Sequence, residues 1–155
     1  MSVAFRRESD EEHKEPRFEL PIPVGPNLVT ATGLEQARAR VAALEAAIAA
    51  ESNAEALAEK QRDLRYWLTR VSTAELAPPP PQGEAAFGSR VRFLLGGEER
   101  QLDIVGHDEA NPAAGKIAFS APLARALIGA GPGDFSDFGG VEDAIEILSV
   151  AAIET

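Results

Sequence analysis

The sequence predicts an α+β protein in which an antiparallel helical hairpin precedes a small β-rich domain with one helix. Between residues 32 and 77, apolar side chains recur every three or four positions, as they do along one face of a helix. Between residues 87 and 155, short alternating runs are separated by glycine turns, which is typical of strands. A run of four prolines, at positions 78–81, separates the two patterns.

The composition limits the classes of function. The chain has 155 residues, 45% of them apolar, which is enough for a modest core. Its net charge of -10 argues against tight non-specific binding to nucleic acid, which needs a basic surface. It has no cysteine, so disulfides, thiolate zinc sites and thiol nucleophiles are excluded. No apolar run approaches membrane-spanning length, and we expect a cytoplasmic protein with no membrane partner.

Residues 1–31 are predicted to form an extended, charged tail. Residues 6–17 mix both charge signs without periodicity. Pro21, Pro23 and Pro26, together with Gly25, then favour extended or polyproline-like backbone.

Residues 32–77 are predicted to form the helical hairpin, a short coiled coil. The spacing of Thr32 and Glu35 is that of a capping box, which predicts the first helix start, and Ser52 and Glu55 repeat it. The apolar seam of the first helix is Leu34, Ala37, Val41, Leu44 and Ile48, and that of the second is Ala54, Leu57, Gln61, Leu64, Leu68 and Val71. Two such helices with almost no loop between them must fold back on each other, each arm being roughly 25–35 Å long.

Residues 78–86 are predicted to be a proline-rich linker, and residues 87–155 a twisted antiparallel sheet with one packed helix. The predicted helix covers residues 122–128, with Pro122 in its first turn and Gly129 at its end. The predicted strands cover residues 90–95, 101–105, 116–119, 135–138 and 144–150.

Several segments of this domain have distinctive sequences. They are residues 104–110 (IVGHDEA), 115–117 (GKI), 120–129 (SAPLARALIG) and 133–134 (GD). Their order closely resembles the C-terminal domain of the bacterial Gre transcript-cleavage factors, over roughly residues 87–150, and the helical hairpin before it resembles the Gre N-terminal arm. The resemblance implies an FKBP-like fold for the domain. It also implies a monomeric partner of core RNA polymerase that docks at the rim of the secondary channel and contacts nascent RNA indirectly.

The resemblance also assigns a role to the hairpin tip, residues 49–55 (AAESNAE). In Gre factors, acidic residues at the tip help the polymerase to hold a magnesium ion and a water that cleaves backtracked RNA. The factor is then no enzyme itself and has no cofactor of its own. The candidates at the tip are Glu51, Ser52, Asn53 and Glu55, with Glu51 and Glu55 as ligands of the shared magnesium. Glu51 stands one residue away from the family's acidic position, and Glu55 is equally explained as a capping residue.

Further residues are candidates for contact with polymerase or RNA. Arg62, Arg65 and Arg70 give the second arm a basic character, although such a pattern also describes a solvated helix face. In the β-rich domain the candidates are Asp108, Glu109, Ser120, Pro122 and Arg125, with Arg125 expected to pair with Asp108 or Glu109. Tyr66 and Trp67 are expected to brace the hairpin against the domain. His13 and His107 lie in the tail and in a loop, and no serine or cysteine constellation accompanies them.

Three functional hypotheses stay open. The first is a Gre-type elongation factor that stimulates cleavage of backtracked RNA. The second is a polymerase-binding regulator without cleavage activity, similar to the nucleoside diphosphate kinase regulator group. Compared with the family pattern, the first arm lacks about two heptads and the second about one, each worth about 10 Å of reach. The third is an interaction module outside transcription.

Overall fold

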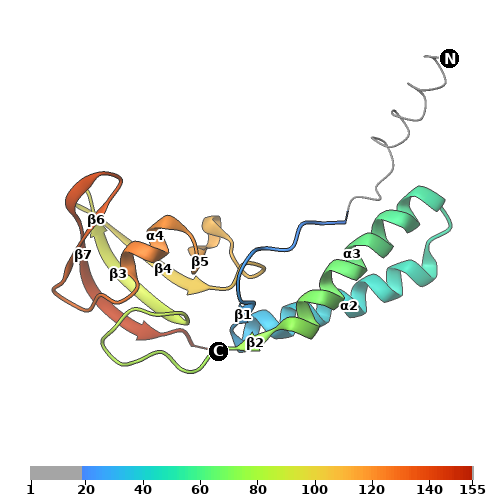
Figure 1. The fold of residues 1–155 in the computed structure, drawn as a ribbon, viewed down its shortest axis with the longest axis horizontal. Coiled ribbons are helices and arrows are strands. Elements are labelled where there is room, and N and C mark those ends of the chain that lie inside the picture. The colour runs from blue at the N-terminus through green and yellow to red at the C-terminus, as the bar shows by residue number, and fades with distance from the viewer. Residues whose placement is uncertain (1–18, 155) are drawn as a thin grey trace, which may run out of the picture. The chain divides into compact units, whose positions relative to one another are not determined.

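The computed structural model describes residues 19–154 and has the predicted α+β architecture (Figure 1). Its first half contains β1 (Leu28–Val29), α2 (Ala31–Ala50), α3 (Ala54–Thr73) and β2 (Glu75–Leu76). Its second half contains β3 (Ser89–Leu95), β4 (Glu98–Val105), the short 3-10 helix η1 (Pro112–Ala114), β5 (Lys116–Ala118), α4 (Pro122–Leu127), β6 (Phe135–Phe138) and β7 (Val141–Ala152). The described residues form two compact units, one of residues 19–22 and 38–72 and the other of residues 23–37 and 73–154. None of the helices within residues 19–154 has the length and apolar character needed to span a membrane.

The helical hairpin consists of two helices of 20 residues each, or about 30 Å at 1.5 Å per residue. Its seam is thin, because Val41, Leu44 and Ile48 are only half-buried. Helices of this length are marginal in water, so the hairpin depends on the contacts between its arms. One of these contacts places the Arg40 guanidinium 5.3 Å from the centre of the Trp67 ring.

Both helices begin at caps other than the predicted ones. The Thr30 hydroxyl accepts a hydrogen bond from the Gly33 amide at 2.9 Å, so Thr30 caps α2 in place of Thr32. The Asn53 side chain accepts one from the Ala56 amide at 2.9 Å and caps α3 in place of Ser52. In each case a capping-type residue lies one or two positions from the predicted one, and spacing alone does not choose between them.

Two short strands were missed by the sequence analysis. Leu28 pairs with Glu75 and Val29 with Leu76 in a parallel ladder. The predicted tail of residues 1–31 therefore contains a strand, and the predicted helical arm gives way to one at Glu75. The rest of the predicted tail, residues 1–18, lies outside the described residues. Strands of two residues held by partners 47 positions apart leave no local periodicity to detect.

The C-terminal sheet has the strand order β5-β4-β3-β7-β6. All neighbours are antiparallel except β4 and β5, which run parallel, with Val105 beside Ala118. All five predicted strands and the predicted helix occur, with boundaries shifted by a few residues. The core combines one face of the sheet with α4, and its fully buried large side chains are Val91, Phe93, Ile104, Leu127, Ile145 and Ile147.

A buried carboxylate joins the start of α2 to the loop after β4. Glu109 has a side chain that is only 4% exposed, and it accepts a hydrogen bond from the Thr30 hydroxyl. Lys116 Nζ lies 3.5 Å from its second oxygen. The negative charge also lies at the N-terminus of α2, where the helix dipole favours it. A Cβ at Gly33 would stand 2.8 Å from this carboxylate, so any other residue there would force the Glu109 side chain to shift.

We predict that Thr30→Val destabilises the protein by about 2 kcal/mol. The substitution removes the helix cap, worth about 1 kcal/mol, and leaves buried Glu109 short of a donor, which costs about 1–3 kcal/mol. Thr32→Val is the matched control, and it should change stability by less than about 0.5 kcal/mol. Urea unfolding followed by circular dichroism measures both, and a larger loss for Thr32→Val would contradict the observed cap.

Candidate functional site

The hairpin tip is a tight connection of residues 51–53 between α2 and α3. The Glu51 amide donates to the Ile48 carbonyl at 3.2 Å, which ends the first helix. Asn53 begins the second, since its side chain accepts from the Ala56 amide and its carbonyl from the Leu57 amide. Ser52 is exposed between them. Asn53 therefore has a structural role as a cap, whatever else it contacts.

The Glu51 carboxylate is already engaged within the hairpin. One of its oxygens forms an ion pair with Lys60 Nζ on α3, and the other accepts a hydrogen bond from the Asn53 amide at 3.1 Å. The hydrogen bond from Lys60 and, after it, the one from the Asn53 backbone lower the pKa of Glu51 below its ordinary value. Glu51 is therefore ionised at neutral pH, and its charge is balanced by a partner nine residues along the chain.

The tip does not fit a magnesium site by itself. Magnesium requires several oxygen ligands in near-octahedral geometry. Glu55 is exposed in the first turn of α3, but Glu51 is turned toward Lys60. Among residues 19–154 there is no group of three or more acidic, histidine or cysteine side chains that could hold a metal ion. The chain on its own thus offers one exposed carboxylate at the tip, where the sequence analysis expected two.

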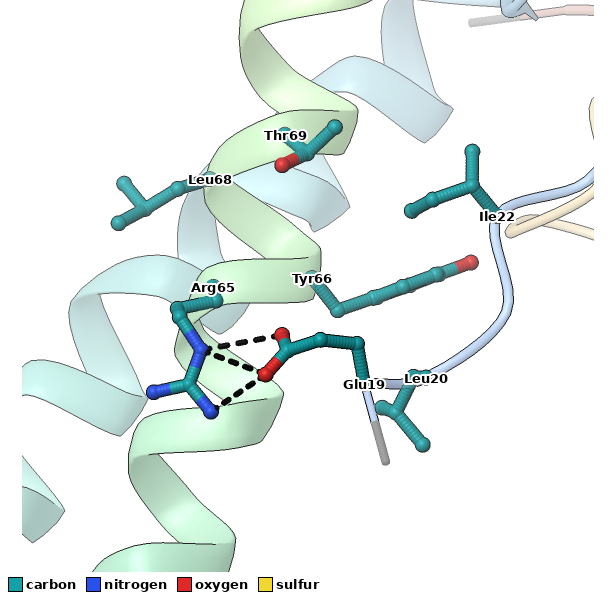
Figure 2. A pocket seen from close by; sticks show the side chains of 7 residues that line it. All are labelled: Glu19, Leu20, Ile22, Arg65, Tyr66, Leu68 and Thr69. Atoms are coloured by element: carbon teal, nitrogen blue, oxygen red, sulfur yellow. Dashed lines mark hydrogen bonds and ion pairs between the residues drawn. The ribbon is translucent and has the colours of Figure 1, made fainter. Parts of the chain in front are cut away.

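The three arginines of the second arm have different surroundings. Arg62 pairs with its neighbour Asp63 at 3.1 Å. Arg65 is held by Glu19, with the shortest contact at 2.7 Å, and Figure 2 shows the two side chains facing each other. Arg70 is 2% exposed and lies 6.0 Å from the Tyr66 ring centre. The predicted basic face is therefore largely neutralised or buried, which a helical-wheel argument does not reveal because it counts charges without their partners.

Tyr66 and Trp67 make contacts within the unit of residues 19–22 and 38–72, which we call the hairpin unit. Their rings meet edge to face with centroids 5.2 Å apart. The Arg40 guanidinium also lies over the Trp67 ring, and Tyr66 lines a cavity with Glu19, Leu20 and Ile22. Bracing against the β-rich domain stays a prediction.

A second group of candidate residues meets at one edge of the sheet. Because β4 and β5 run parallel, the loops that follow them lie side by side. The Phe119 amide donates to the Val105 carbonyl at 2.9 Å, which joins the two loops. The His107 ring then packs on Phe119, with centroids 5.2 Å apart, and Phe119 packs on Phe87. We call the group of His107, Ser120, Pro122 and Arg125 the loop–α4 surface.

The residues of this surface are accessible. Ser120, Pro122 and Arg125 are exposed, and His107 is half-buried. Ser120 Oγ lies 3.5 Å from His107 Nε2, which is too long for a strong hydrogen bond. Ser120 and His107 are thus neighbours, which the sequence alone did not indicate. The pair lacks the geometry of an activated nucleophile. This arrangement is therefore suited to recognition rather than to nucleophilic catalysis.

The two acidic candidates in the loop after β4, Asp108 and Glu109, are less exposed than most residues of this surface. Asp108 is half-buried, whereas Glu109 is buried and pairs with Thr30 and Lys116. Of the two partners expected for Arg125, Asp108 or Glu109, Glu109 is therefore engaged by other residues and is a structural group. His107 was the contributor that sequence reading missed. The signal was that His107 and Ser120 each lie two residues after a strand, β4 and β5. Using it required knowing that these strands pair in parallel.

Comparison with known proteins identifies the C-terminal half of the chain. Residues 80–153 match the family model "Transcription elongation factor, GreA/GreB, C-term". The transcription elongation factor GreA of Vibrio parahaemolyticus is 39% identical over 75 residues, which are 47% of this chain and 48% of that protein. The GreA of Vibrio vulnificus is 36% identical over 94 residues, covering 57% of this chain and 59% of that protein. The chain thus spans about half the length of the curated relatives it matches.

Solved structures of Gre-type proteins are also similar. The GreA factor homolog Gfh1 of Thermus thermophilus is 18% identical, with a TM-score of 0.38, and covers 83% of this chain and 100% of its own. A GreA/GreB factor from Nitrosomonas europaea is 23% identical, with a TM-score of 0.40, and covers 83% and 99%. The family match and the identities of the curated relatives concern the C-terminal half of the chain. Residues 80–153 thus match the C-terminal domain of GreA/GreB transcription elongation factors.

Proposed function

We propose that the chain binds core RNA polymerase through its C-terminal domain and regulates transcript elongation. The observation that carries this proposal is the family match over residues 80–153, which spans the whole five-stranded sheet and α4. The relatives that match it at 35–40% identity are named transcription elongation factors. The acidic balance of the chain favours a protein partner over direct binding to nucleic acid.

The loop–α4 surface is the contact region that we infer for the polymerase. Ser120, Pro122 and Arg125 are exposed on neighbouring turns, and the buried α4 side chains Ala124 and Leu127 hold them on a fixed backbone. A rigid patch with one positive charge and several polar groups suits a protein interface, because few side chains need to be ordered on binding. The resemblance to Gre factors supplies the rim of the secondary channel as the docking place.

A specific observation favours a regulator that does not stimulate RNA cleavage. Stimulated cleavage would need tip carboxylates that are free to approach a metal ion. Glu51 is instead paired with Lys60 and hydrogen-bonded to the Asn53 amide. Each arm of the hairpin is about 30 Å long, which also limits the reach of the tip. We infer that the hairpin acts by occupying space beside the RNA path.

We predict that tagged full-length protein retains core RNA polymerase from a bacterial lysate and that Arg125→Glu weakens this retention about tenfold or more. Reversing a charge at a protein interface places like charges together, which costs enough free energy for such a loss. Arg92→Glu is the matched control, since Arg92 is an exposed arginine on β3 of the same domain. If the parent protein retains no polymerase, the proposed function fails, and if both variants weaken binding equally, the loop–α4 surface is wrong.

We predict that adding the protein to a backtracked elongation complex leaves the rate of RNA shortening unchanged. The physical reason is the pairing of Glu51, which leaves Glu55 as the exposed carboxylate of the tip. The measurement is gel analysis of labelled RNA, with binding to the complex confirmed in the same sample. A bound protein that accelerates cleavage would contradict this part of the proposal.

We predict that Lys60→Gln raises the pKa of Glu51 toward its ordinary value. The Lys60 hydrogen bond is the largest cause of the lowered pKa. A lowered pKa in the folded state stabilises the fold above the unfolded-state pKa, and this contribution disappears as the pH falls through the folded-state pKa. Titration of the Glu51 carboxyl by NMR measures the shift. Arg62→Gln is the control, and an unchanged Glu51 pKa in Lys60→Gln would contradict the ion pair.

A further inference from the structure

Residues 19–22 lie against α3 as a segment without helix or strand (Figure 2). Glu19, Leu20 and Ile22 line a cavity of about 470 Å³ whose other wall is Arg65, Tyr66, Leu68 and Thr69 of α3. We call these four side chains the α3 groove. All seven residues belong to the hairpin unit, whereas the chain from Pro23 to Ala37 belongs to the other unit. The segment is thus a short peptide of this chain seated on its own helix.

The sequence of the segment explains why it stays extended. Leu20 and Ile22 each precede a proline, and a residue before proline is held in the extended or polyproline region. The backbone of such a segment is already restricted when it is unbound. It therefore loses little conformational entropy when it lies on a surface, which is why proline-rich peptides are common ligands.

Arg65 binds the charged end of the segment, the Glu19 carboxylate. Its Nε lies 3.0 Å from each oxygen of the Glu19 carboxylate, and its terminal nitrogen lies 2.7 Å from one of them. This fork-like contact is the geometry by which arginine recognises a carboxylate. It lowers the pKa of Glu19 and raises that of Arg65. Beside it, Ile22 projects toward Tyr66 and Thr69, so the groove takes a carboxylate and then an aliphatic side chain (Figure 2).

The contact between residues 19–22 and the α3 groove is weak. The side chains of Arg65 and Glu19 are 53% and 56% exposed, so water and salt screen their attraction. Ile22 and Leu68 also remain exposed, so the apolar part of the contact is shallow. The described part of the segment contributes no backbone hydrogen bond to α3. A competing ligand of the same chemistry can therefore displace residues 19–22 from the α3 groove at a small cost in free energy.

We propose that the α3 groove is a binding surface for an extended peptide and that residues 19–22 occupy it as a built-in competitor. The ligand is a partner-protein segment in which a carboxylate precedes aliphatic side chains, as in Glu19-Leu20-Pro21-Ile22. RNA is the less suited ligand, because the chain is strongly acidic and the neighbouring Arg62 is paired with Asp63. Displacement of the segment exposes the groove, so the hairpin has a covered state and an open state. This inference does not depend on polymerase binding.

The test uses full-length protein and a capped synthetic peptide with the sequence of residues 19–24. Binding is followed by NMR at the side chains of Tyr66 and Trp67, the single tyrosine and the single tryptophan of the chain. The variant Glu19→Gln weakens the internal competitor, so it should bind the peptide about three- to tenfold more tightly than the parent. Arg65→Gln should lose peptide binding in both backgrounds. Glu59→Gln is the matched control on α3, an exposed glutamate outside the groove, and it should behave as the parent.

Three results would overturn the proposal. One is equal peptide affinity of Glu19→Gln and the parent. Another is undiminished binding by Arg65→Gln, in protein whose helical circular dichroism matches that of the parent. The third is tighter binding of an oligouridine than of the peptide to Glu19→Gln, which would assign the groove to RNA. Because the assay contains no polymerase, each of these outcomes leaves the proposed function to its own test.

Discussion

A single buried carboxylate joins several parts of the unit formed by residues 23–37 and 73–154. Glu109 lies in the loop after β4 and receives the hydroxyl of Thr30, which also caps α2. Lys116 balances its charge from the first residue of β5. The start of the helical hairpin, the loop that carries His107 and the strand that leads to Ser120 are thus tied to one internal group. A polar group that is buried and fully satisfied in this way fixes one arrangement, because every alternative leaves it unpaired.

The two regions that the family resemblance singled out, the loop–α4 surface and the hairpin tip, differ in their chemical state. The loop–α4 surface is exposed and rests on a rigid core of apolar side chains. The hairpin tip is internally satisfied, because Lys60 and the Asn53 amide engage Glu51. Charges along the arm are likewise balanced within the chain, through Arg62 with Asp63 and Arg65 with Glu19. The proposed polymerase contact therefore lies on the domain, whereas the charges of the arm are paired within the chain.

Elements with a local sequence pattern were predicted, whereas contacts between residues far apart in the chain were missed. Alternation identified β3, and the Pro122 and Gly129 signals bracketed α4 within about one residue. The β1–β2 ladder, the parallel β4–β5 pair and the Thr30–Glu109 contact each join residues far apart in the chain, so no window of sequence contains them. The candidate site shows the same division. The sequence named candidate residues, but whether Glu51, Glu109 and Arg70 were free, paired or buried depended on partners that only the fold brings near.

The most direct test of this account is a structure of the protein bound to a core RNA polymerase elongation complex with its catalytic magnesium in place. We predict that the loop–α4 surface contacts the polymerase and that Glu51 remains paired with Lys60. No oxygen of the hairpin tip should then lie within about 2.1 Å of the magnesium, the distance of a direct ligand. A complex in which Glu51 or Glu55 coordinates the magnesium would contradict the account, as would a complex bound through another face of the domain.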